Sequence, residues 1–88
     1  MAEVKPTVFK VIQSYGGLKE AYFETPAATA ADTINFADNN VEGAVICDLQ
    51  NDGVRVNSPI SGDDSNIVTI GTGPDADVLV GRILFRSY

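Results

Sequence analysis

The chain consists of short runs of β-branched and aromatic residues, and each run ends near Gly, Asn, Asp or Pro. Such runs are typical of β-strands, and a spacing of roughly 8–12 residues between them is typical of sandwiches and barrels. The runs occupy residues 7–15, 18–25, 32–38, 43–50, 54–57, 66–71 and 77–87. The pattern predicts an all-β fold, either a small antiparallel β-sandwich or a partly closed β-barrel of about seven short strands.

Two of the turns join neighbouring runs directly. Gly16-Gly17 separates the first two runs, and Asn51-Asp52-Gly53 separates the fourth and fifth. Glycine accepts the positive φ of a hairpin turn, and Asp-Gly is among the strongest hairpin signals, so both pairs of runs are predicted to form hairpins. Residues 26–31 (PAATAA) are predicted to form a loop or one helical turn capped by Thr25.

The last run has two different faces. One face carries Leu79, Ile83 and Phe85 without any charge, so these three side chains are predicted to fill the core. Gly81 lies on the same face, where it predicts a bulge or the close approach of a neighbouring strand.

The opposite face of this run mixes aliphatic side chains with arginine. It is more apolar than the surface of a monomer needs to be, which indicates a contact surface. Tyrosine suits such a surface, because its ring buries area while its hydroxyl stays polar. The predicted interface residues are Val80, Arg82, Leu84, Arg86 and Tyr88.

The length predicts a single β domain, residues 1–88, with residues 1–6 as a short N-terminal arm. A domain of this size buries only about 60–65% of the surface of its unfolded chain, and such domains are often reinforced by disulfides, metals or self-association. The single cysteine, Cys47, excludes an internal disulfide, and a standard zinc site is excluded because the chain has no histidine. The remaining possibilities are self-association and good packing alone, and of the two we expect a homo-oligomer.

The residue types that usually carry catalysis are scarce. Without histidine there is no Ser-His or Cys-His pair, and Cys47 lies in an apolar run, as an inert buried thiol does. The chain is therefore predicted not to be an enzyme and to need no cofactor. Asp63 with Asp64, and Asp75 with Asp77, contain oxygen ligands that suit calcium, but solvated turns explain these aspartates better.

The formal charge of −6 comes from twelve acidic and six basic residues. A nucleic acid or an anionic membrane surface binds basic footprints, so neither is expected as a partner. No apolar run approaches the roughly 20 residues of a membrane span, and the first residues lack the pattern of a secretion signal.

Three segments carry a resemblance to a known group of proteins. The opening VKPTVFKVIQ, the central AADTINFAD and the closing NIVTIGTGPDADVLVGRILFRS resemble small β-rich structural proteins of bacteriophages and other viruses, nearest the capsid decoration (cement) proteins. This resemblance implies a virion protein that assembles in the host cytoplasm, oligomerises, with a trimer favoured, and binds the shell of the major capsid protein. It implies no functional residue.

We therefore expect a non-enzymatic structural protein that stabilises a capsid shell. Such a protein gains from multivalency, because many weak contacts on a lattice sum to strong retention. The alternative is a small ligand- or carbohydrate-binding β-module, although the chain has no tryptophan for the aromatic platform that such modules use.

Overall fold

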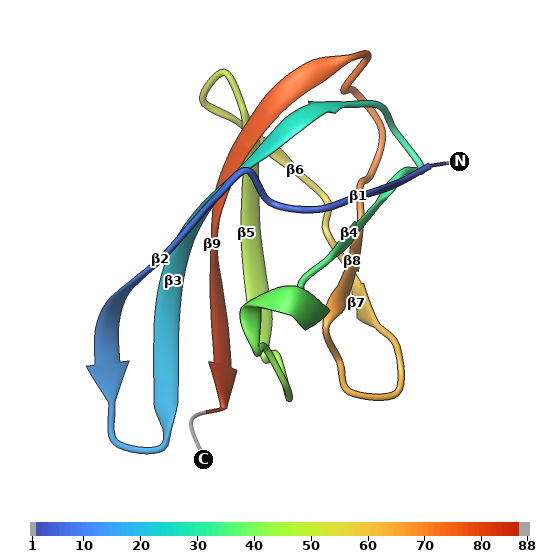
Figure 1. Cartoon of the computed structure of the whole chain (residues 1–88). Helices are drawn as coiled ribbons and strands as arrows, with labels where there is room; N and C mark the ends of the chain where they lie inside the picture. The colour runs from blue at the N-terminus through green and yellow to red at the C-terminus, as the bar shows by residue number, and fades with distance from the viewer. Residues whose placement is uncertain (1, 87–88) are drawn as a thin grey trace.

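The computed structural model describes residues 2–86 and consists almost entirely of β-strands (Figure 1). The elements, in chain order, are β1 (Glu3–Val4), β2 (Val8–Tyr15), β3 (Leu18–Ala28), β4 (Thr33–Asn35), the 3₁₀ turn η1 (Ala37–Asn39), β5 (Ile46–Asn51), β6 (Val54–Val56), β7 (Ile60–Ser61), β8 (Ile67–Thr69) and β9 (Asp77–Arg86).

The strands form two sheets that pack as a sandwich. The five-stranded sheet has the order β2-β3-β9-β5-β6, and the four-stranded sheet has the order β1-β4-β8-β7. Figure 1 shows β2, β3, β9 and β5 side by side on the left and the four-stranded sheet on the right. Neighbouring strands are antiparallel except for β1 and β4, which are parallel. The predicted all-β sandwich is confirmed, and the sheets do not close into a barrel.

Both predicted hairpins are present. In the β2–β3 hairpin Tyr15 faces Leu18, and Gly16 has a φ of 62°. In the β5–β6 hairpin Asn51 faces Val54, and the two turn residues Asp52 and Gly53 both have positive φ, 51° and 81°. Positive φ at both positions is the geometry of the type I′ turn that Asp-Gly favours.

The helical turn considered for residues 26–31 is wrong, because β3 continues through Pro26 to Ala28. Proline cannot donate to a sheet ladder, and the register between β3 and β9 shifts between Glu24 and Ala27 to accommodate it. The Thr25 hydroxyl accepts a hydrogen bond from the Leu79 N–H at 3.1 Å, so a side chain satisfies the donor at the bulge.

Three other segments differ from the sequence-based expectation. The helical turn of the structure is η1, which replaces the end of the predicted strand 32–38. The predicted loop 58–65 contains the short strand β7, which pairs with β8. Residues 1–6, predicted as an arm, contain β1, and the Thr33 N–H donates to the Ala2 carbonyl at 2.9 Å.

The core lies between the two sheets. Leu79, Ile83 and Phe85 are buried, as their shared face predicted. Phe23 of β3 and Phe36, which follows β4, pack edge to face, with ring centroids 4.9 Å apart. The other buried apolar residues are Ala21, Ala28, Ile34, Val41, Cys47, Leu49, Val56, Val68 and Ile70. Aromatic pairs of this geometry add stabilisation beyond area burial, so the rings tie the two sheets together.

Candidate functional site

The five-stranded sheet has one face against the four-stranded sheet and one face toward solvent, which we call the outer face. The registers of β2, β3, β9, β5 and β6 place the following residues on it: Val8, Lys10, Gln13, Tyr15, Leu18, Glu20, Tyr22, Glu24, Ile46, Asp48, Gln50, Arg55, Val78, Val80, Arg82, Leu84 and Arg86. Because β9 is the middle strand, its residues lie at the centre of the outer face.

The outer face contains the predicted interface residues that the structure describes. Arg82 and Arg86 are exposed, whereas Val80 and Leu84 are half-buried between their cross-strand neighbours. Tyr88 lies outside the described residues. Their role in an interface stays a prediction, but the structure brings the four described residues together on one exposed surface.

Charge on the outer face differs from charge on the rest of the chain. Four of the six basic residues lie on this face, namely Lys10, Arg55, Arg82 and Arg86, together with only three of the twelve acidic residues. The outer face therefore has a formal charge of +1, and the remainder of the chain has −7.

Two of the three carboxylates on the outer face accept hydrogen bonds from tyrosine hydroxyls. Tyr15 donates to Glu20 at 3.1 Å, and Tyr22 donates to Glu24 at 2.7 Å. These hydrogen bonds to carboxylates raise the pKa of both tyrosines above the usual value. Within residues 2–86 no ion pair joins these carboxylates to an arginine, because the one ion pair there links Lys5 to Asp38.

Arg82 lies beside a shallow depression near the centre of the outer face. Its register neighbours are Tyr22 on β3 and Asp48 on β5. The depression has a volume of about 380 Å³, and its other lining residues are Gln50, Val80 and Gly81. An aromatic ring, an amide, a carboxylate and a guanidinium thus surround one hollow.

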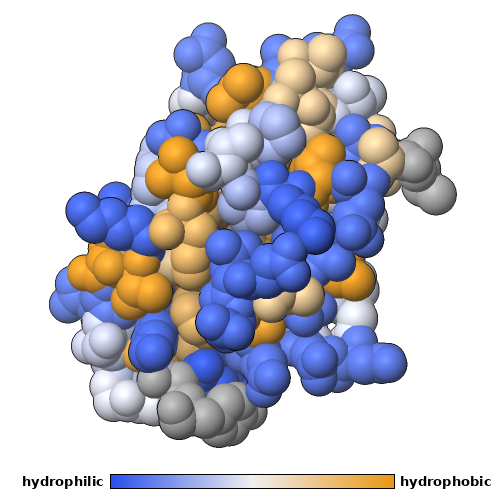
Figure 2. Space-filling view, viewed as in Figure 1, coloured by the Kyte–Doolittle hydropathy of each residue, from blue (hydrophilic) through white to orange (hydrophobic). Residues whose placement is uncertain are grey.

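Strand β2 forms one edge of this sheet and is unusually apolar for an exposed strand. Val8, Val11, Ile12 and Tyr15 are each 40–50% exposed. Figure 2 shows hydrophobic atoms at the left of the molecule, over β2, among hydrophilic ones. Edge strands are ready to pair with other chains, and Lys10 and a register shift at Ile12 are two features that limit such pairing.

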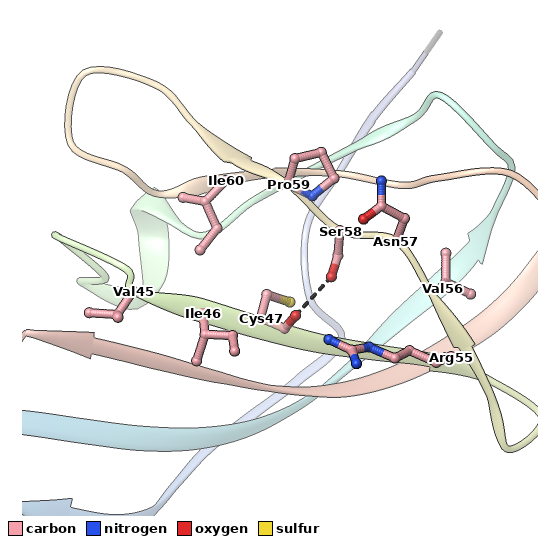
Figure 3. Close-up of a pocket in the computed structure, with 9 residues that line it drawn as sticks. All are labelled: Val45, Ile46, Cys47, Arg55, Val56, Asn57, Ser58, Pro59 and Ile60. Atoms are coloured by element: carbon pink, nitrogen blue, oxygen red, sulfur yellow. Dashed lines mark hydrogen bonds between the residues drawn. The ribbon is translucent and has the colours of Figure 1, made fainter.

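A second hollow lies where β6 separates from β5, and it has a volume of about 530 Å³. Figure 3 shows the Ser58 hydroxyl donating to the Cys47 carbonyl, at 2.8 Å, and the Arg55 side chain extending along β5. Just before β5 begins, the Val45 N–H donates to the Leu84 carbonyl at 2.7 Å. The side chains of Val45 and Ile46 are both exposed.

The thiol of Cys47 is buried, and burial raises its pKa to about 12. A thiol with this pKa is protonated at neutral pH and is a poor nucleophile. The geometry therefore gives Cys47 a packing role.

Of the aspartates considered for calcium, Asp63, Asp64 and Asp75 lie in turns or bends, and Asp77 begins β9. Asp77 accepts hydrogen bonds from the Asn51 side chain and from the Asp75 N–H, both at 3.0 Å, whereas Asp63 and Asp64 are exposed between β7 and β8. Among residues 2–86 no group of three or more His, Cys, Asp or Glu side chains could hold a metal ion. In the same part of the chain no helix has the length and apolar character needed to cross a membrane.

No protein-family model matches the sequence, and neither a curated protein nor a solved structure matches the chain.

Proposed function

We propose that this chain is a non-enzymatic structural protein of a virion, a capsid decoration protein that forms homo-oligomers, with a trimer favoured, and binds the capsid shell. The observation that carries the proposal is the outer face of the five-stranded sheet. It is broad, it combines aliphatic side chains with arginine and tyrosine, and no second layer within residues 2–86 packs on it.

The composition of the outer face suits protein contact. Protein interfaces are enriched in tyrosine and arginine, and the residues that contribute most of the binding energy cluster near the centre. Arg82 and Leu84 lie in the middle strand of the sheet, so they would be at the centre of an interface on this face. A guanidinium pairs with two carboxylate oxygens at once, which gives such a contact direction as well as affinity.

The proposal predicts that replacing Arg82 and Leu84 together with Asp abolishes assembly and leaves the fold intact. Arg82 is exposed and Leu84 is half-buried, so strand content by circular dichroism should not change. Size-exclusion chromatography with light scattering measures the mass of the particle against the 9.3 kDa chain.

The matched control changes the charge by the same amount away from the outer face. Lys5→Asp with Val54→Asp replaces one cation and one exposed aliphatic side chain, and it should assemble like the unmodified chain. Assembly of the Arg82/Leu84 variant, or a monomeric unmodified chain, would contradict the proposal. Capsid and portal genes beside this gene would support the virion, and metabolic genes there would contradict it.

The second candidate is a small ligand- or carbohydrate-binding module, and the depression beside Arg82 is the observation in its favour. Tyr22 supplies a ring, and Asp48 and Gln50 supply the polar groups that fix a sugar. This candidate predicts a monomer that binds saccharides from a glycan panel, with binding lost in Tyr22→Ala. Failure of every glycan to bind would exclude carbohydrate.

A further inference from the structure

Three of the acidic residues outside the outer face lie in two loops at one end of the sandwich. The Gly43 N–H donates to the Asp64 carbonyl at 2.8 Å, and the Ala44 N–H donates to the Ser65 carbonyl at 3.1 Å. These bonds bring the loop before β5 against the loop between β7 and β8. Glu42, Asp63 and Asp64 lie in these two adjoining loops, and we call these three residues the acidic end.

The acidic end is available for contact. All three residues are exposed, and within residues 2–86 their side chains accept no hydrogen bond and form no ion pair. Three exposed carboxylates on adjoining loops attract a cationic partner.

The outer face has the complementary charge. Lys10, Arg55 and Arg82 are exposed there, and none of them forms an ion pair within residues 2–86. The chain has twice as many acidic as basic residues, so carboxylates are plentiful on a second copy. The unpaired cations of the outer face make it a complementary surface for those carboxylates.

We propose that the outer face of one subunit binds the acidic end of a second copy of this chain, head to tail. This inference rests on the proposed function and names the two surfaces that meet in the oligomer. Two acidic ends would repel each other, whereas face against end pairs the exposed cations of one subunit with the exposed carboxylates of the next. Val80 and Leu84 flank Arg82 on the same face of β9, and their aliphatic side chains would add apolar burial to the charge contacts.

A head-to-tail contact has consequences for symmetry. Because it joins two different surfaces of the same chain, it forms a closed ring when the rotation between subunits closes, and a filament when it does not. Charge pairs at such a contact are screened by salt, since the Debye length shortens from about 30 Å at 0.01 M to about 3 Å at 1 M ionic strength. Association of the unmodified chain should therefore weaken at least about tenfold between low and high salt.

The experiment uses two variants with reversed charge. The face-reversed variant carries Lys10→Glu and Arg82→Glu, and the end-reversed variant carries Asp63→Lys and Asp64→Lys. Each variant lacks one of the two surfaces, so each should be monomeric alone by light scattering. When they are mixed, the intact end of the first meets the intact face of the second, and a particle containing both chains should form.

The matched control for the end-reversed variant is Glu3→Lys with Asp75→Lys, which reverses two exposed carboxylates outside the acidic end and should assemble normally. If the end-reversed variant assembles alone while the face-reversed variant does not, the outer face binds something other than the acidic end, and the head-to-tail contact is wrong although the proposed function stands. If the mixture stays monomeric, or salt strengthens assembly, the inference is also overturned. An unmodified chain that is monomeric at every concentration instead removes the proposed function itself.

Discussion

Phe23 and Gly81 face each other across β3 and β9, and the phenyl ring occupies the space that a side chain at position 81 would take. A Cβ atom built on Gly81 would lie 2.8 Å from Phe23 Cζ and 2.6 Å from the Asp48 carbonyl oxygen. The absence of a side chain therefore lets the Phe23 ring lie against the middle strand. It also lets β5 approach β9 closely.

Gly81→Ala should destabilise the fold by about 1–3 kcal/mol, because the backbone oxygen of Asp48 has to move to admit a methyl group. Urea unfolding measures this change in free energy. Gly17→Ala is the control, since nothing lies within 4 Å of its Cβ position and its φ is not in the left-handed region. That variant should stay within about 0.5 kcal/mol of the unmodified chain. Equal losses in the two variants would contradict the steric explanation.

Thr25 satisfies a buried backbone donor at the bulge of β3, and a second prediction follows from that. Thr25→Val keeps the shape but removes the hydroxyl that accepts from Leu79 N–H, so it should cost about 1–3 kcal/mol. Thr25→Ser keeps the hydroxyl and should lose clearly less. The same unfolding measurement compares the two, and a valine variant as stable as the serine variant would show that the hydrogen bond contributes little.

The strand pattern and the hairpins could be predicted, but the register of β2 could not. The turn at Gly16-Gly17 alone pairs Tyr15 with Leu18, and continuing that register would set Phe9 opposite Glu24. The shift at Ile12 instead sets Phe9 opposite Phe23, with its ring toward the core. A bulge of one residue depends on packing against the other sheet, which no local pattern reports.

The candidate site too could be predicted only in part from the sequence. Alternation along a single strand identified Val80, Arg82 and Leu84 as one face. Lys10 and Arg55 were missed, because they reach the same face from strands whose order in the sheet is β2-β3-β9-β5-β6 and not the order of the chain. Strand order depends on tertiary packing and cannot be read from local patterns. The composition therefore showed the excess of acidic residues, but it did not show that most of the basic residues share one surface.

Phe85→Ala should cost about 3–5 kcal/mol, which is enough to unfold a marginal domain. Phe85 is buried, and its ring lies 6.2 Å from that of Phe9 between centroids, so truncation opens a cavity between β2 and β9. Val78→Ala on the same strand is the control, because Val78 is 60% exposed and its loss should be within about 0.5 kcal/mol. Near-native stability of the Phe85 variant would show that the site collapses to fill the cavity.

Cys47 should make the fold less stable at alkaline pH. Burial raises the pKa of its thiol from 9.0 to about 12 in the folded chain, whereas the unfolded chain ionises near the ordinary value. Below pH 9 both states hold the proton, so Cys47 adds no pH dependence there. Between about pH 9 and 12 only the unfolded state releases the proton, and the free energy of unfolding should fall by up to about 1.4 kcal/mol per pH unit.

Because other side chains also change charge at alkaline pH, the test compares slopes between two proteins. Urea unfolding of the unmodified chain and of Cys47→Ala at several pH values from 8 to 11 should show a steeper alkaline decline in the unmodified chain. The thiol of the native protein should also react with a disulfide reagent at pH 8 far more slowly than the thiol of the urea-unfolded chain, because it is only 5% exposed and protonated. Parallel slopes together with rapid native labelling would mean that Cys47 ionises freely in the fold, and the groove between β5 and β6 would then reach the sulfur atom.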